Sequence, residues 1–322
     1  MSDKPHKRFQ WIGTEKEILR KLAEGSELVE TSAGVVEYAT SGEGPKVLGV
    51  HGGIGGYDQG LVLCRPFVEN GFSAICPSRP GYLRTPASVG RTFAQQADSF
   101  AALLDVLEVN KVGVVGGSAG GPPAYEFAMR HPDRTAALIA IDAISCYYPM
   151  PEKAGKVTQA LFMSNPGIWF SELLAVNFPK PIIKQILKTE GYLTTKQLKD
   201  RVSHILEDTG KLEFAVDFFR TMNPYKPRKE GTDIDIEQGA KIDKLPLERV
   251  KAPTLVIHGE KDADVKFSDG EYAAATIPNA EHFWIEEGTH LGFWLSDQAE
   301  EVQGLAVDFL NKHLLDTQDK EG

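Results

Sequence analysis

Residues 112–121 read Val-Gly-Val-Val-Gly-Gly-Ser-Ala-Gly-Gly, and this stretch decides the fold. The apolar run Val112 to Val115 is typical of a buried strand, and a helix is expected from about Ala119 to Arg130. Only glycine and alanine flank Ser118, which leaves room for a backbone that doubles back sharply. A serine in this strand-turn-helix context exposes its hydroxyl, so we predict that Ser118 is a nucleophile. A chance match in a glycine-rich chain is the alternative, and the flanking strand and helix argue against it.

Strand-like and helix-like segments alternate on both sides of this turn. Helical spacing of apolar residues from Phe93 to Leu107 predicts a helix before it, and a last helix is expected around Val302 to Leu310. The expected strands are residues 35–39, 47–50, 72–76, 137–141, 254–258 and 283–285. Several of these strands are apolar along their whole length, which indicates a parallel sheet covered by helices on both faces. The sequence therefore predicts an α/β fold.

The alternation stops after Asp142 and resumes at Thr254, and the residues between them show only helical patterns. We predict a core of residues 1–142 and 251–322, a helical appendage at about residues 14–25, and a helical cap of residues 143–250. Large apolar residues of the cap and of a glycine-rich loop are candidates to contact a substrate: Ile54, Tyr147, Phe162 and Trp169. An alternative is that the aromatic residues of the cap simply pack it onto the core.

A second glycine-rich segment, His51 to Gly56, follows the strand 47–50 directly. Such a loop leaves backbone N–H groups free to bind an oxyanion, together with the N–H of the residue after the nucleophile. We predict Gly53 and Ala119 as these donors. A phosphate-binding loop and a purely structural turn are the alternatives, but neither known phosphate-loop spacing fits these residues.

A base and an acid complete the expected site. His290 lies in a loop just after the last expected strand, where its side chain can reach the edge of the sheet, and we predict it as the base. Asp262 follows the strand 254–258 and is the predicted acid, because a carboxylate there can bind the second imidazole nitrogen. Asp264 and Asp142, which end or follow neighbouring strands, remain rivals for this role.

Arg79 and Arg84 lie on the loop after the strand 72–76, close to the expected site. Pro80, Gly81 and Pro86 are typical of a surface turn, so we interpret both arginines as solvated loop charges. No other basic residue can be placed near the strand edge from the sequence.

The composition excludes several classes of protein. The chain has 322 residues, 42% of them hydrophobic, and a formal net charge of -10, which argues against a nucleic-acid partner. The sequence contains no run of about 18 apolar residues, so we expect no membrane span. Three scattered cysteines provide neither a disulfide framework nor a zinc site, so we expect a cytoplasmic protein without a bound metal. A homodimer is compatible with the sequence, which does not define the oligomeric state.

The segments 116–120, 51–53, 259–262 and 288–292 resemble those of capped α/β-hydrolases, the superfamily of esterases, prolyl-iminopeptidase-like enzymes and carbon–carbon bond hydrolases. The resemblance covers about residues 35–314, less the cap. It implies an eight-stranded, mostly parallel sheet, a helical lid, no metal or organic cofactor, a catalytic triad of Ser118, Asp262 and His290, and an oxyanion hole formed by Gly53 and Ala119.

Two positions depart from the pattern of the peptidase relatives. Those proteins often have proline and tryptophan where this chain has Ile54 and Ala119, which places a peptidase role in doubt. We expect a small-molecule substrate, a carboxylic ester or lactone that is partly apolar, cleaved through an acyl-enzyme. Cleavage of a carbon–carbon bond by the same triad, and a ligand receptor built on the same fold, remain the alternatives.

Overall fold

A computed structural model describes residues 13–149 and 163–318, with side chains described as far as residue 314. Its centre is an eight-stranded sheet with the strand order β1-β2-β4-β3-β5-β6-β7-β8. The first two strands pair antiparallel with their neighbours, and the other pairs are parallel. The strands are β1 Glu27–Thr31, β2 Gly34–Ser41, β3 Lys46–Val50, β4 Ser73–Pro77, β5 Val112–Gly117, β6 Thr135–Ile141, β7 Thr254–Gly259 and β8 Glu281–Ile285.

Helices cover both faces of the sheet because successive strand residues point to opposite sides. Val47 of β3 belongs to one hydrophobic core and its neighbour Leu48 to the other. The first core is covered by α2 Tyr57–Leu63, α3 Arg65–Glu69, α13 Gly292–Leu295 and α14 Ala299–Gln318. The second is covered by α4 Phe93–Val106, α5 Gly121–Arg130 and α12 Phe267–Thr276. The expected parallel sheet with two covered faces is therefore present.

The N-terminal part adds one helix and one edge strand to this sheet. Helix α1 spans Glu15–Glu24, and the side chains of Thr14 and Glu17 form the capping box that begins it. Strand β1 was not predicted, because its half-exposed edge carries charged residues such as Glu30 instead of an apolar run.

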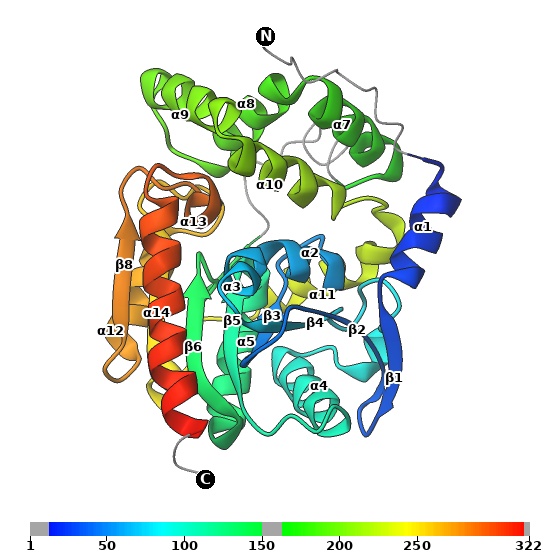
Figure 1. The fold of residues 1–322 in the computed structure, drawn as a ribbon, viewed down its shortest axis with the longest axis vertical. Coiled ribbons are helices and arrows are strands. Elements are labelled where there is room, and N and C mark those ends of the chain that lie inside the picture. The colour runs from blue at the N-terminus through cyan, green and yellow to red at the C-terminus, as the bar shows by residue number, and fades with distance from the viewer. Residues whose placement is uncertain (1–12, 150–162, 319–322) are drawn as a thin grey trace.

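The described residues between β6 and β7 form the α-helices α7 Asn165–Asn177, α8 Pro179–Glu190, α9 Thr195–Glu207, α10 Thr209–Arg220 and α11 Lys229–Gly239. Figure 1 shows α7 to α10, here called the cap helices, above the carboxyl ends of the strands. Phe214 of α10 contacts the core by stacking on Trp294, with ring centroids 5.4 Å apart. Helix α11 instead packs beside the core, where Gly231 N donates to Gly81 O at 2.8 Å. Only the first part of the insertion therefore covers the strand ends.

Candidate active site

The turn after β5 has the strained geometry that its sequence predicts. Ser118 adopts a positive φ of 53°, a conformation that is uncommon for a residue with a side chain. Side-chain carbons at Gly116 and Gly120 would collide with Ala124 and with the carbonyl oxygens of the loop after β3. The glycines thus let the chain pass directly from β5 into α5 and hold the Ser118 side chain at the carboxyl edge of the sheet.

The predicted acid and base lie on neighbouring loops after β7 and β8. His290 Nδ1 is 2.7 Å from Asp262 Oδ2, and both side chains are buried. The other carboxylate oxygen of Asp262 accepts from the backbone N–H groups of Asp264 at 2.8 Å and Val265 at 3.0 Å. Because three donors converge on Asp262, its carboxylate is held in one orientation against the imidazole.

Asp264 occupies the far side of the same imidazole. Its Oδ2 lies 3.4 Å from His290 Nε2, the nitrogen that would have to accept a proton from Ser118. The Tyr148 hydroxyl, from the segment after β6, donates to Asp264 Oδ1 at 2.7 Å. Ser118 and His290 line the same cavity. His290 is therefore paired with a carboxylate at each nitrogen, and it must exchange Asp264 for Ser118 to act as a base.

These charges determine the protonation of His290. Burial by itself disfavours the imidazolium, but the negative charges of Asp262 and Asp264 outweigh burial and raise the pKa of His290 well above its usual value. The charged form is therefore favoured until one of the carboxylates moves away or the pH rises.

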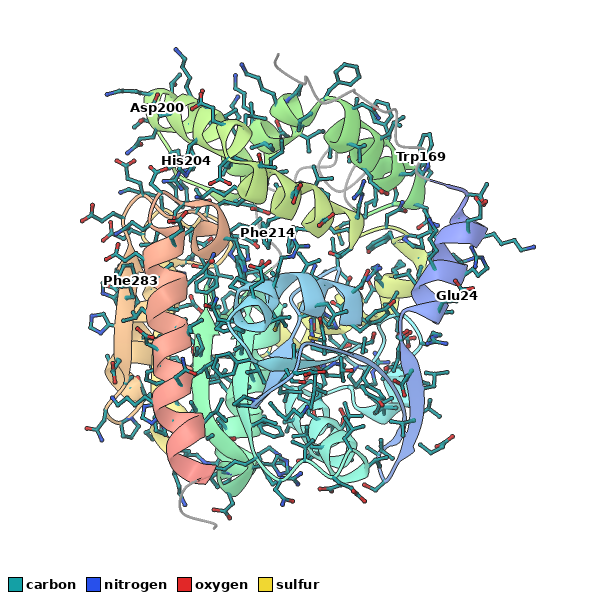
Figure 2. All side chains as sticks on the ribbon, in the orientation of Figure 1. Glu24, Trp169, Asp200, His204, Phe214 and Phe283 are labelled. Atoms are coloured by element: carbon teal, nitrogen blue, oxygen red, sulfur yellow. The ribbon has the colours of Figure 1, made fainter. Side chains whose placement is uncertain are left out.

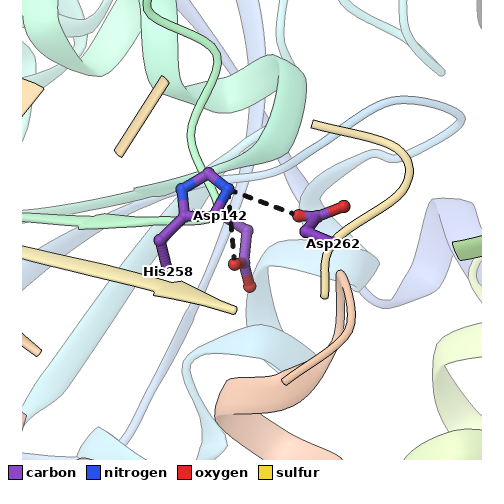
Figure 3. Close-up of side chains that lie close together, drawn as sticks. All are labelled: Asp142, His258 and Asp262. Atoms are coloured by element: carbon purple, nitrogen blue, oxygen red, sulfur yellow. Dashed lines mark ion pairs between the residues drawn. The ribbon is translucent and has the colours of Figure 1, made fainter. Parts of the chain in front are cut away.

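Asp142, the other rival acid, lies close to His258 and Asp262 (Figure 3). Its Oδ1 accepts from Gly259 N at 2.8 Å and lies 4.0 Å from His258 Nε2. Burial, followed by the neighbouring charge of Asp262, raises the pKa of Asp142 well above its usual range. A carboxyl group that stays neutral cannot stabilise an imidazolium by its charge, so this environment favours Asp262 over Asp142 as the acid.

Ligand atoms of Asp142, His258 and Asp262 lie within 4.8 Å of one another, close enough to share a cation. Their hydrogen bonds do not fit that role. His258 Nε2 lies 3.1 Å from the carbonyl oxygen of Val265, which can only accept, so this nitrogen carries the proton and offers no lone pair. Asp262 Oδ2 is already bound to His290. We therefore assign no metal to this cluster.

The end of cap helix α8 binds the loops after β7 and β8 through its backbone. The carbonyl oxygen of Glu190 accepts from Ala263 N at 3.0 Å and from His290 N at 3.3 Å. Two residues later, Tyr192 N donates to Lys261 O at 2.8 Å. The relative position of Asp262 and His290 thus depends on the cap as well as on the sheet.

The loop after β3 carries Gly53, one of the two predicted oxyanion donors, and the other, Ala119, directly follows Ser118. Gly53 and Ala119 both line the cavity, and a side-chain carbon at Gly53 would lie 3.9 Å from Ala119 Cβ. Gln59 of α2 accepts a hydrogen bond from Gly52 N at 2.9 Å. From the other side, the Arg79 guanidinium donates to the carbonyl oxygens of His51 and Gly52, both at 3.0 Å. The loop is therefore fixed by side chains from two other segments.

The interpretation of Arg79 and Arg84 as solvated loop charges is wrong. Arg79 is 0% exposed and forms two 2.6 Å contacts with the carboxylate of Asp235 on α11. Arg84 is about one-third exposed and lies 2.6 Å from the buried Glu37. The local composition of a turn says nothing of partners such as Asp235, which is 156 residues away and approaches only when the insertion folds back.

A cavity of about 280 Å³ opens between the cap helices and the strand ends. Ile54 lines it as predicted, whereas Tyr147 and Trp169 do not and are 57% and 43% exposed. Tyr147 lies on an extended segment whose next residue, Tyr148, faces the cavity instead. Trp169 lies on the outer side of α7 (Figure 2), whose buried face carries other residues. Phe162 falls outside the described residues.

Carboxyl groups are prominent in the cavity wall. Among the described residues that line it are Asp142, Glu190, Asp235 and Asp264, with His290 but no lysine or arginine. Burial raises the pKa of Glu190 to about 8, and its buried Oε2 has no hydrogen-bond partner within the described part of the chain. Neither Glu190 nor Gln59 was predicted from the sequence, which contains no motif around either residue.

Within residues 13–149 and 163–318, no helix is both long and apolar enough to cross a membrane.

Comparisons with known proteins agree with this architecture. A family model described as the alpha/beta hydrolase fold matches residues 45–297. The chain is 28% identical over 288 residues to the uncharacterized hydrolase YcgS of Bacillus subtilis (strain 168), across 88% of this chain and 98% of that protein. It is 25% identical over 279 residues to 2-hydroxy-6-oxo-6-phenylhexa-2,4-dienoate hydrolase of Burkholderia cepacia, across 84% and 89% of the two chains.

Among solved structures, an alpha/beta hydrolase fold protein from Nakamurella multipartita is 38% identical, with a TM-score of 0.85 over 88% of this chain and 98% of that one. The family match spans most of the sheet and the loops that carry Asp262 and His290. The chain therefore belongs to the α/β-hydrolase fold family.

Proposed function

We propose that this hydrolase acts through Ser118 as nucleophile, His290 as general base and Asp262 as the acid that orients the base. One observation carries the proposal. Ser118 on its strained turn shares a cavity with a histidine whose Nδ1 is 2.7 Å from a firmly held carboxylate. Acyl transfer by a serine uses such a histidine–carboxylate pair as the base for the hydroxyl, once His290 Nε2 has turned from Asp264 to Ser118.

The chemistry follows from these positions. Ser118 Oγ attacks a carbonyl carbon while its proton passes to His290 Nε2, and Asp262 offsets the charge of the imidazolium. The backbone N–H groups of Gly53 and Ala119 bind the oxyanion. His290 then protonates the leaving alkoxide, which leaves an acyl-enzyme. Water, deprotonated by His290, releases the acid and restores the serine.

The cavity favours a neutral substrate, so we propose a carboxylic ester or a lactone. A substrate carboxylate would lose its hydration on entering and would need a cation to offset the cost. The described lining provides carboxyl groups and no lysine or arginine. Three arginines near the strand ends are already paired with carboxylates: Arg79 with Asp235, Arg84 with Glu37 and Arg228 with Asp58.

Carbon–carbon bond cleavage is the second candidate function. It is supported by the Burkholderia cepacia relative, whose name describes hydrolysis of a dienoate, an acidic compound. The same triad could perform that reaction, but the described cavity wall offers no lysine or arginine to offset the charge of a carboxylate. A ligand receptor on the same fold would bind tightly and turn over at most once.

Labelling of the purified full-length protein with a fluorophosphonate probe tests the nucleophile, and Ser118→Ala is the loss-of-label variant. Ser99→Ala, which removes a buried hydroxyl outside the cavity, is the matched control. A panel of neutral esters, lactones and a 2-hydroxy-6-oxo-dienoate then separates the candidates. We expect kcat/KM of about 10⁴ M⁻¹s⁻¹ or more for the best neutral ester or lactone. Preference for the dienoate would favour carbon–carbon cleavage, and labelling without steady-state turnover would favour a receptor.

A further inference from the structure

The side-chain amide of Gln59 is held in one orientation at the wall of the cavity. The residue is 1% exposed, and its Oε1 accepts from Gly52 N at 2.9 Å. Because only the oxygen of an amide accepts and only its nitrogen donates, this bond decides which end faces the loop. Nε2 is buried and has no hydrogen-bond partner among the described residues. A buried donor without an acceptor is costly, which suggests that a ligand supplies the acceptor.

Gln59 lies close to the nucleophile. It lines the same cavity as Ser118, Gly53 and Ala119. A side-chain carbon at Gly52 would be 3.3 Å from Ser118 Cβ and 3.5 Å from Gln59 Oε1, so only the width of one glycine separates the two side chains. Gln59 is therefore a near neighbour of the nucleophile in the cavity wall.

The bond to Gly52 also limits what the loop itself can offer. The Gly52 N–H is used by Gln59 Oε1, so it cannot bind a substrate oxygen. Gly53 N–H is the next donor along the loop, and Ala119 N–H follows the nucleophile. The Gln59 amide takes up one loop donor and leaves its own N–H groups without an acceptor among the described residues.

We propose that Gln59 Nε2 donates a hydrogen bond to the oxygen that becomes negatively charged when Ser118 attacks, as a third donor beside the backbone N–H groups of Gly53 and Ala119. This inference rests on the serine mechanism proposed above. It assigns Gln59 two roles, because Oε1 fixes the loop while Nε2 touches the reacting oxygen. The substrate class is one with a carbonyl oxygen at the reacting centre, as in esters and lactones.

A donor to the oxyanion acts mainly in the transition state, so its loss lowers kcat more than it raises KM. Gln59→Met removes both the acceptor for Gly52 N and the N–H donors, and methionine has a similar length to glutamine. We expect kcat to fall about 100-fold with KM nearly unchanged. Gln59→Glu keeps an oxygen that can accept from Gly52 N but loses the N–H groups. We expect it to lose at least as much activity as Gln59→Met once its carboxyl group is ionised.

Gln96→Met is the matched control. Gln96 is also fully buried and also has an Nε2 without a partner among the described residues, but it does not line the cavity. We expect this variant to keep kcat within about threefold of wild type. Thermal unfolding of all three variants checks that they fold.

A pair of inhibitors separates a catalytic contact from a structural one. A trifluoromethyl ketone forms an oxyanion adduct with a serine, whereas the matching methyl ketone binds mainly as the neutral carbonyl. We expect Gln59→Met to weaken the first inhibitor by the same factor as kcat/KM and to leave the second nearly unchanged. Equal weakening of both inhibitors, or activity near wild type in Gln59→Glu at a pH at which its carboxyl group is ionised, would overturn the assignment.

Measurements on the wild-type protein separate a failure of the Gln59 assignment from a failure of the serine mechanism. If wild type is labelled by the fluorophosphonate and active while Gln59→Met keeps its kcat, only the assignment of Gln59 fails. If wild type is neither labelled nor active, the serine mechanism and the assignment of Gln59 fail together.

Discussion

Replacing Asp264 with asparagine should move the acidic limb of the pH–rate profile to lower pH. Asp264 Oδ2 lies 3.4 Å from His290 Nε2, and with Asp262 it raises the pKa of His290 despite burial. Only the neutral imidazole can take the proton of Ser118, so activity should rise as the pH passes this raised pKa. Removing the charge of Asp264 disfavours the imidazolium, so the neutral base becomes available at lower pH.

The size of the effect follows from the distance. Two unit charges 3.4 Å apart interact by about 1.2 kcal/mol at the dielectric constant of bulk water, which corresponds to about an eightfold change in a protonation equilibrium. Asp264 is 26% exposed, so its surroundings screen less than bulk water and this value is a lower limit. On the acidic limb, kcat/KM relative to its plateau should therefore be at least about eightfold higher in Asp264→Asn than in wild type.

The assay is kcat/KM for the best ester between about pH 5 and pH 10, together with an NMR titration of the His290 imidazole, which needs no substrate. Asp133→Asn, at an exposed aspartate before β6, removes the same charge and is the control. If Asp264→Asn and wild type had the same limb and the same imidazole titration, Asp264 would not face His290 in the working protein. A shift to higher pH would contradict the electrostatic reasoning altogether.

Four further outcomes are expected. Ser118→Ala should lower kcat by about 10³-fold or more with a thermal midpoint close to that of wild type, measured by ester hydrolysis and calorimetry; residual turnover above about a tenth would exclude Ser118 as nucleophile. Burial raises the pKa of Glu190 to about 8, so wild type loses stability as the pH rises from the ordinary range of a carboxyl toward that value. Glu190→Gln should therefore unfold at a higher temperature than wild type near pH 8 and at a similar temperature near pH 4, and equal midpoints at both would refute the burial argument. Arg79→Ala should lower the free energy of unfolding, measured by chemical denaturation, by about 3–5 kcal/mol, because it leaves the buried carboxylate of Asp235 without its ion pair. Arg84→Ala should lower it much less, because Arg84 is partly exposed to solvent. EDTA should leave activity unchanged, since the acidic cluster beside His290 is already hydrogen-bonded, and restoration by zinc after an EDTA loss would contradict this.

Local features of this protein could be predicted from the sequence because their causes are local. The sharp turn at Ser118 needs small neighbouring residues, because larger side chains there would collide with nearby atoms. Ser118 adopts its positive φ in this turn. The buried strands were predicted because a fully covered parallel strand is apolar throughout. The capping box of Thr14 and Glu17 was read from residues three positions apart. Strand β1 was missed because one side of an edge strand is free to be polar.

Choices between similar residues were decided only by the tertiary structure. Asp142, Asp262 and Asp264 all follow strands at the same edge of the sheet, and the sequence could rank them but not measure their distances to His290. In the structure, Asp262 contacts Nδ1 and Asp264 lies near Nε2, while Asp142 is buried close to Asp262. Differences of a few ångströms, set by how adjacent strands are packed, separate these three environments.

The cap is the region in which the sequence alone was least able to predict where side chains point. An aromatic residue in a helical insertion can face a substrate or solvent, and Tyr147, Trp169 and Tyr148 differ in orientation and not in composition. The residues around Arg79 are typical of a surface turn, and the sequence therefore predicted an exposed charge. In the structure Arg79 is buried, because α11 brings Asp235 to it from far along the chain. Side-chain partners that are distant in sequence leave no local pattern, so the carboxyl groups of the cavity wall and the bond between Gln59 and Gly52 became visible only in the folded protein.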